Sequence, residues 1–343
     1  MPHFLRPSIR AMAGYTPGEQ PRDGAFLKLN TNENPYPPSP RVFEAIRAAL
    51  TGDNLRKYPD PLGTRFRQAA GRVLGVDPDG ILIGNGSDDV LTILTRALVA
   101  EGGLVVSPAP SYLLYKTLAD IQGARFQGIP FDSNWKVDPA QAVRDASVTF
   151  FANPNSPSGT MVDLETLAAW PGTMVVDEAY VDFADTNALG LLSRRRDLIV
   201  TRTLSKSYSL AGIRFGFAVG DPELIRHLVK VKDSYNCDVL SLAAATAAIE
   251  DQEHLRGITA AICATRTRLA DALRKLEFSV TDSQANFVWA RHARPVKPLY
   301  EELKRRYILV RYMNYPGYGD GLRISVGTDA EIDRLLDVLR TLL

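Results

Sequence analysis

Short apolar runs and helical patterns alternate through the middle of the chain. Between residues 58 and 233, short runs of mostly apolar residues are separated by stretches in which apolar residues recur at helical spacing. The runs cover residues 81–83, 104–106, 148–151, 174–176, 198–200 and 215–219. Apolar strands that alternate with helices are typical of a mostly parallel sheet covered by helices. The pattern therefore predicts an α/β fold for this part of the chain.

The two ends of the chain have different patterns. The first forty residues are rich in proline and have few periodic apolar positions, which indicates an arm, and helical spacing begins at Val42. An alanine-rich stretch at 240–276 predicts long helices. Strand, helix, strand, strand and helix are then expected at residues 287–289, 299–303, 308–311, 322–326 and 332–342. We expect an arm and helix (1–55) that pack on the small domain or a dimer interface, a large domain (56–235) and a smaller α+β domain (236–343).

Composition narrows the class of protein. A chain of 343 residues exceeds the usual size of one compact core, so two domains are expected. Forty basic and 39 acidic residues leave a formal charge of +1, which gives no reason to expect a nucleic acid or membrane partner. The two cysteines, Cys237 and Cys263, and four scattered histidines give no reason to expect a metal site or a disulfide framework. No signal-like or membrane-spanning run is present, so a cytoplasmic enzyme is the expectation.

Lys206 lies in the stretch with the most informative chemistry. It follows the apolar run 198–200 and the hydroxyl residue Ser205, and Arg214 comes eight positions later. An aldehyde cofactor with a phosphate tail needs an amine that can react with it, and a hydroxyl and a guanidinium that can hold the phosphate. Taken alone, a lysine near an arginine is more often a solvated pair, so this stretch by itself does not establish a cofactor site.

Asp177 is a second residue that fits a cofactor site. It ends the apolar run 174–176, and ligands gather beyond the carboxyl ends of parallel strands. An aspartate there can keep a pyridine nitrogen protonated, which makes the ring an electron sink, and Tyr180 could bond the ring's phenolic oxygen. Asp177 could instead cap a helix. Lys206 follows twenty-nine residues later, at the end of the next predicted strand, and the pair fits a pyridoxal phosphate site.

A glycine turn at residues 84–86 follows the first apolar run. Ser87 and Asp88 then open an amphipathic helical pattern. Glycine lets the backbone approach a ligand closely, and the N–H groups at a helix N-terminus can bind phosphate, so Gly86, Ser87 and Asp88 are phosphate-binding candidates. Ser87 or Asp88 could instead cap the helix.

The order of these motifs resembles that of a known family. A phosphate cup, an Asn-Pro-rich loop, Asp-Glu-Ala-Tyr, and then Ser-Lys with an arginine eight residues later are similar to fold-type I pyridoxal-phosphate aminotransferases of class I/II. Within them, residues 29–40, 58–60, 309–311 and 322–328 resemble the histidinol-phosphate aminotransferase family. The motifs span residues 15 to 328. The resemblance implies a homodimer with pyridoxal 5'-phosphate, histidinol phosphate and glutamate/2-oxoglutarate as ligands, and a place in histidine biosynthesis.

The resemblance also implies roles for residues around the cofactor. Lys206 would be the catalytic lysine, and Tyr112 would stack on the pyridine ring, although a lone tyrosine could equally be core packing. Relatives often carry an asparagine, which bonds the ring oxygen, where this chain has Ser156. Asn155 is therefore our candidate for that amide.

The substrate residues implied by the resemblance lie near both ends of the chain. Arg323 would be the planar fork that binds a carboxylate or the phosphate ester, and Arg311 would be a second cation for the larger charge. Arg311 could instead be a strand-edge charge. Tyr15 and Tyr58 resemble the family's phosphate-side tyrosines, the latter reaching across a dimer interface.

Three other functions compete with this interpretation. A broad aromatic amino-acid aminotransferase is the nearest alternative, because an imidazole and a phenyl ring need similar flat pockets. A threonine-phosphate decarboxylase shares the cofactor site, but the Asn-Glu-Asn-Pro block at 32–35 favours the aminotransferase. A ligand sensor within a transcription regulator needs a DNA-binding module, and no span of the sequence is left for one.

Overall fold

The larger of the two main sheets has seven strands. The computed structural model describes residues 4–14, 18–21 and 26–343. The strand order is β2-β8-β7-β6-β5-β3-β4. The strands are β2 (Ile81–Gly84), β3 (Leu104–Ala109), β4 (Arg125–Pro130), β5 (Val148–Ala152), β6 (Met174–Asp177), β7 (Leu198–Thr203) and β8 (Gly216–Val219). Strand β8 is antiparallel to both neighbours and the other described pairs are parallel, which confirms the mostly parallel sheet.

Burial explains which strands could be predicted. All residues of β2, β5, β6, β7 and β8 are buried, and each of these strands contains a short apolar run that the sequence shows. Strand β4 lies at the edge of the sheet and is mostly exposed or half-buried. The sequence does not predict it, because an edge strand of this kind needs no continuous apolar run.

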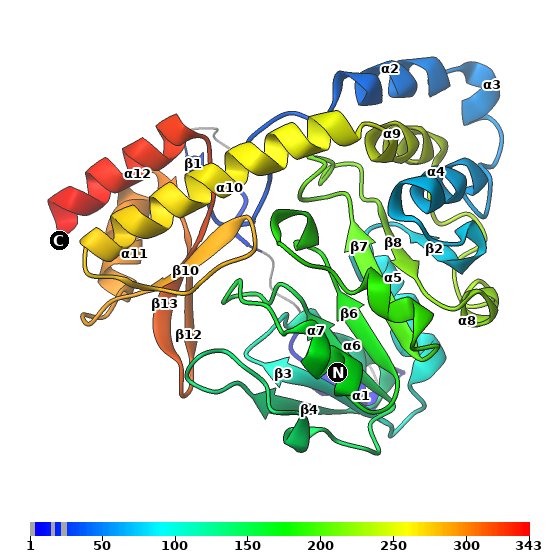
Figure 1. Ribbon diagram of the computed structural model, residues 1–343, viewed down its shortest axis with the longest axis horizontal. Coiled ribbons are helices and arrows are strands. Elements are labelled where there is room, and N and C mark those ends of the chain that lie inside the picture. Colours follow the sequence, from blue (N-terminus) through cyan, green and yellow to red (C-terminus); the bar gives the residue numbers. More distant parts are fainter. Residues whose placement is uncertain (1–3, 15–17, 22–25) are drawn as a thin grey trace.

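Helices cover both faces of this sheet (Figure 1). On one face, α5 (Ser87–Leu98), α6 (Leu114–Gln122) and α8 (Pro222–Leu228) share a core with Val175 and Ile199. On the other face, the cores include residues of α4 (Thr64–Leu74), α7 (Leu164–Ala169) and α9 (Val239–Glu250). Successive strand residues alternate between the two faces, so Val176 belongs to the second set.

The second main sheet is four-stranded and antiparallel, in the order β12-β13-β10-β9. Its strands are β9 (Ser279–Val280), β10 (Phe287–Arg291), β12 (Arg311–Tyr315) and β13 (Gly319–Ser325). The helices α10 (Gln252–Lys275), α11 (Lys297–Arg305) and α12 (Asp329–Leu342) contribute to the core that covers it. Figure 1 shows α10 (yellow) running from the side of the larger sheet to the smaller one. The expected α+β character of this part is confirmed.

Two segments pack differently from the sequence expectation. Helix α9 is expected in the small domain, but its alanines share a core with Ile83 and Phe217 of the larger sheet. Helix α2 (Pro40–Ala49) packs there too through Val42. The arm, in contrast, enters the smaller part, where β1 (Leu27–Lys28) pairs in parallel with β11 (Ile308–Leu309). The two remaining described α-helices are short: α1 (Pro7–Ala11) and α3 (Gly52–Leu55).

Two features are absent from the described residues. None of the helices there is both long and apolar enough to cross a membrane. Over the same ranges, no group of three or more histidine, cysteine, aspartate or glutamate side chains could hold a metal ion.

Candidate active site

A cavity of about 610 Å³ lies where strands β5, β6 and β7 end. Ala152, Asp177 and Thr203, the last residues of these strands, are in its wall. Loops, the arm and the smaller sheet complete it. The other lining residues used below are Asn30, Thr31, Asn32, Ser87, Asp88, Tyr112, Ser156, Tyr180, Ser205, Lys206, Arg214, Arg311 and Arg323. The carboxyl edge of a parallel sheet is the usual place for a ligand in such folds.

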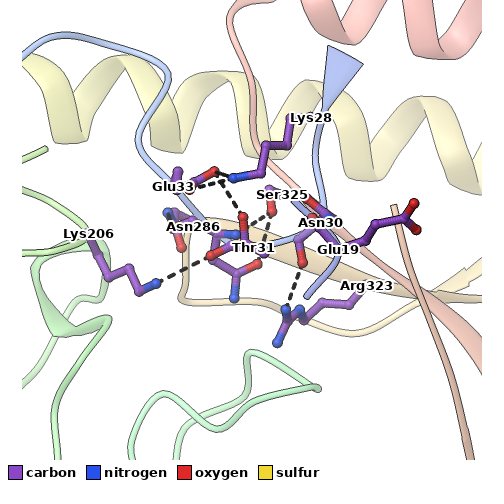
Figure 2. Close-up of polar contacts among 10 residues, drawn as sticks. Glu19, Lys28, Asn30, Thr31, Glu33, Lys206, Asn286, Arg323 and Ser325 are labelled. Carbon is purple, nitrogen blue, oxygen red and sulfur yellow. Dashed lines mark hydrogen bonds and ion pairs between the residues drawn. The ribbon is translucent and has the colours of Figure 1, made fainter. Parts of the chain in front are cut away.

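Lys206 reaches into this cavity from the loop after β7. Its Nζ donates to the carbonyl oxygen of Thr31 in the arm at 3.4 Å (Figure 2) and lies 5.8 Å from the centroid of the Tyr180 ring. The side-chain amide of Asn34 donates to the carbonyls of Lys206 and Ser207, at 3.0 and 3.1 Å. The arm therefore contacts the lysine loop through both Thr31 and Asn34.

Asp177 lies at the floor of the cavity and is only 4% exposed. Its Oδ2 accepts a hydrogen bond from the hydroxyl of Tyr115 at 2.8 Å, and its Oδ1 accepts one from Thr201 at 3.1 Å. Burial raises the pKa of Asp177 to about 6, although both hydrogen bonds oppose the shift. The next helical turn starts at Val181 and has Tyr180 as its N-cap, so the alternative that Asp177 caps a helix is wrong.

The N-terminus of α5 forms a cup with the lysine loop. Its N-cap is Gly86, and Ser87 and Asp88 lie within the first turn, so the capping alternative for these two residues is wrong. Gly86 has φ +88°, and a Cβ there would lie 2.5 Å from Nη2 of Arg214. Arg214 donates to the hydroxyl of Ser205 at 3.3 Å and pairs with Asp88 at 3.5 Å. Glycine therefore leaves room for a guanidinium beside a helix N-terminus, an arrangement suited to a phosphate.

Two tyrosines line the cavity between the cup and the arm. The Tyr112 hydroxyl donates to Asp88 at 3.1 Å, and its ring also packs against the core under α5 and α6. Core packing and a place in the cavity wall are thus both observed for Tyr112. The Tyr180 hydroxyl accepts from the Asn32 amide at 3.0 Å, which connects it to the arm.

In the Asn-Pro-rich loop, Asn155 does not lie where the sequence prediction puts it. Asn155 is buried, and its amide nitrogen donates to the Pro110 carbonyl at 3.2 Å and to the Ser158 hydroxyl at 2.9 Å. It lies outside the described wall of the cavity, whereas Ser156 is part of it. The amide nitrogen of Asn155 already donates to two acceptors within the protein, so the structure favours Ser156 over Asn155 for the position facing the ligand.

Arg311 and Arg323 face each other across a pair of strands. They are directly paired residues of β12 and β13, and both line the cavity. Arg323 donates to the Ser156 hydroxyl at 2.9 Å and to the Asn30 carbonyl at 3.0 Å, and its guanidinium lies 5.4 Å from the Phe287 ring centroid. Like charges in direct cross-strand register destabilise a sheet, and an anion bound beside the two guanidinium groups would offset this cost.

Tyr58, one of the two phosphate-side tyrosines, is not among the described residues of the cavity wall. Tyr58 is 81% exposed and stacks on Tyr235, with ring centroids 4.4 Å apart and an interplanar angle of 14°. Tyr15 lies outside the described residues.

Several residues that build the site were not predicted from the sequence. Tyr115 and Thr201 bond Asp177. Asn32 has φ +57°, is buried, and accepts hydrogen bonds from Asn286 and Ser325 at 3.0 Å each. Figure 2 shows the arm between the two parts of the site, with Arg323 reaching Asn30 and Lys206 reaching Thr31. Three asparagines at positions 30, 32 and 34 could have indicated that the arm forms hydrogen bonds with other parts of the chain, because buried asparagine side chains are seldom without partners.

The chain belongs to the class I and II aminotransferase family. The family profile described as "Aminotransferase class I and II" matches residues 25–339. The chain is 52% identical over 336 residues to a histidinol-phosphate aminotransferase of Rhodopirellula baltica, covering 96% of this chain and 92% of that protein. It is 47% identical over 350 residues to histidinol-phosphate aminotransferase 1 of Trichormus variabilis, covering 100% of both.

A solved structure is also similar over nearly the whole chain. It is the crystal structure of histidinol-phosphate aminotransferase from Sinorhizobium meliloti in complex with pyridoxal-5'-phosphate. Its TM-score is 0.89 at 27% identity, and the match covers 100% of this chain and 99% of that one. The family resemblance and the fold class expected from the sequence are therefore confirmed.

Proposed function

We propose that this protein is a pyridoxal-phosphate enzyme that exchanges an amino group between histidinol phosphate and 2-oxoglutarate, with imidazole-acetol phosphate and glutamate as the other pair. Two relatives at 52% and 47% identity are named histidinol-phosphate aminotransferases, which supports the reaction. The Sinorhizobium meliloti enzyme, with the same fold, was solved with pyridoxal-5'-phosphate, which supports the cofactor.

The residues present fit the cofactor at both of its ends. The cup of Gly86, Ser87, Ser205 and Arg214 would hold the phosphate, since it offers a helix N-terminus, hydroxyls and a guanidinium. Asp177 would face the ring nitrogen, because a carboxylate at the buried floor can hold a proton there.

Smaller roles follow from the walls of the cavity. Tyr112 would cover the face of the cofactor ring, and Tyr180 and Ser156 would face its phenolic oxygen. When bound, the cofactor supplies an aldehyde that takes up the amino group and a ring that delocalises electrons. Nζ of Lys206 would be the base that takes the proton from the substrate carbon bearing the amino group.

The pairing of Arg311 with Arg323 is the observation that most supports histidinol phosphate as the substrate. A phosphate ester is close to a dianion at neutral pH, so it gains from two guanidinium groups, whereas an α-carboxylate has one charge for the fork of Arg323. The cross-strand register puts Arg311 opposite Arg323 on the same wall of the cavity. A broad aromatic aminotransferase would need only one of them.

A substrate panel with Arg311→Ala tests this assignment. Wild type should prefer histidinol phosphate to phenylalanine, and Arg311→Ala should lower kcat/KM for histidinol phosphate by at least about tenfold, a loss typical of one charge-assisted contact. The effect on glutamate and phenylalanine should be smaller. Arg291→Ala is the matched control, because Arg291 of β10, in the same sheet, donates to the Tyr318 carbonyl outside the described cavity wall. A wild-type preference for phenylalanine, or an equal loss for all substrates, would identify an aromatic aminotransferase instead.

We propose further that the enzyme works as a homodimer in which Tyr58 contributes to the partner's site. The exposed Tyr58–Tyr235 stack and the exposed Leu50 and Leu55 are what an interface would cover. Mixing the inactive variants Tyr58→Ala and Lys206→Ala should restore part of the activity, because a hybrid has one intact site. A fully active monomer by sedimentation contradicts the shared site. The domain boundaries and the cytoplasmic location expected from the sequence stay predictions.

A further inference from the structure

Tyr115 is a buried ionisable residue that makes none of the proposed contacts with cofactor or substrate. It is the second residue of α6 and is fully buried, yet its hydroxyl donates to Oδ2 of Asp177, which is 62 positions away in the sequence, at 2.8 Å. Helix α6 thus places a polar atom against the buried face of the carboxylate.

The ring of Tyr115 is held in place on two sides. It stacks on Phe150 of β5 at a centroid distance of 5.0 Å and an interplanar angle of 9°. Its other contact is edge-to-face with Tyr112, at 5.6 Å and 87°. A ring packed in this way has little rotamer freedom, so the hydroxyl stays directed at Asp177.

The protonation state of Tyr115 is settled by its surroundings. Burial and the neighbouring charge of Asp177 raise the pKa of Tyr115 well above its ordinary value. The hydroxyl is therefore a neutral donor over the whole pH range in which enzymes work. Together with Thr201, which donates to Oδ1 at 3.1 Å, it stabilises the ionised carboxylate against the cost of burial.

Other ionisable groups also face this pair. Asp88 of α5 acts on Asp177 as a like charge, and Arg214 offsets it through their 3.5 Å pair. The hydroxyls of Tyr112 and Tyr180 lie near Tyr115. Burial and, to a smaller extent, the charge of Asp88 raise the pKa of Asp177, and the two hydroxyl donors oppose this shift.

We propose that Tyr115 is a positioning residue that holds Asp177 ionised and turned toward the cavity, so that the carboxylate can keep the proton on the ring nitrogen of the bound cofactor. This inference rests on the proposed cofactor, but not on the proposed substrate. It explains why α6 brings a hydroxyl, rather than an apolar side chain, into an otherwise apolar core.

Tyr115→Phe tests the proposal, because it removes one oxygen atom and keeps the stacked ring. The first measurement is the affinity of the cofactor-free protein for pyridoxal phosphate between pH 5 and 8. In the variant, the loss of affinity at low pH should begin about one pH unit higher, since one charge-assisted hydrogen bond is roughly equivalent to a one-unit shift. The acid limb of kcat/KM should move in the same direction.

Two further variants separate positioning from stability. Thr201→Val removes the donor to the other oxygen and should shift the affinity profile in the same direction, which keeps the test available if Tyr115→Phe folds poorly. Tyr318→Phe is the matched control, since it loses a partly buried hydroxyl contact with the Phe131 carbonyl, and neither residue is in the described cavity wall. It should lower the thermal midpoint but leave both pH profiles unchanged.

The outcomes are distinct. Profiles of Tyr115→Phe and Thr201→Val that coincide with wild type would overturn the proposal, as would a Tyr115→Phe shift that persists in an Asp177→Asn background. A wild type that binds no pyridoxal phosphate overturns this inference and the proposed function together. A wild type that binds it but prefers phenylalanine overturns only the substrate assignment, because the affinity profile does not involve the substrate.

Discussion

When Asp177 is ionised, its buried carboxylate should lower the unfolding free energy of the cofactor-free protein. It is buried, and burial raises its pKa from an ordinary 3.8 to about 6. Because the folded state binds this proton more tightly than the unfolded state, the contribution of Asp177 to stability is fully present below about pH 4. It is lost as the pH rises through about 6.

The magnitude follows from the shift. About two pKa units correspond to about 3 kcal/mol of unfolding free energy, and roughly 1.4 kcal/mol of this develops between pH 5 and pH 8. Asp177→Asn removes the titration and keeps the shape of the side chain. In the cofactor-free proteins, the unfolding free energy of the variant minus that of wild type should therefore rise by about 1.4 kcal/mol from pH 5 to pH 8.

Urea denaturation of both cofactor-free proteins at several pH values measures this difference. Asp163→Asn is the control, because Asp163 caps α7 and its pKa is lowered, so its stability difference from wild type should be flat from pH 5 to pH 8. Loaded with cofactor, Asp177→Asn should lose at least about a hundredfold in kcat, by analogy with other preorganised electrostatic groups. Parallel stability curves for wild type and Asp177→Asn would refute the expected cost of burial, and turnover within a few-fold of wild type would refute the role at the ring nitrogen.

Three further variants test other parts of the structure. Arg202→Met should lower the unfolding free energy by about 3–5 kcal/mol, because Arg202 donates twice to the fully buried Glu178. The double variant Arg202→Met/Glu178→Leu should recover most of this in chemical denaturation, and an equal loss in both would contradict the account. Lys206→Ala should keep the thermal midpoint of wild type and yield no cofactor-labelled peptide after borohydride reduction; a label on another lysine with activity retained counts against Lys206. Gly86→Ala should weaken pyridoxal phosphate binding by about tenfold or more, since φ is +88° and a Cβ would lie 2.5 Å from a guanidinium nitrogen. Gly75→Ala, with φ +68° and no distant atom of the described residues within 4 Å of its Cβ, should lose stability but not affinity.

The apolar pattern and the order of the motifs determine much of this protein by themselves. The buried strands of the larger sheet are predictable because a strand covered on both faces is mostly apolar, and that is a local property. The placement of Asp177, Lys206 and the cup of Gly86 in one cavity is also predictable. Each follows a strand, and the carboxyl ends of parallel strands meet at one edge.

Only the tertiary structure decided which side chains face the cavity and what holds them. Asn155 and Ser156 are adjacent in the sequence, but the hydrogen bonds of their loop turn the first into the protein and leave the second in the wall. Tyr115 reaches Asp177 from a helix 62 positions away, and the arm joins the smaller sheet through β1 and β11. Contacts of this kind depend on how distant elements pack, and no local periodicity encodes the packing of elements that are far apart in the chain.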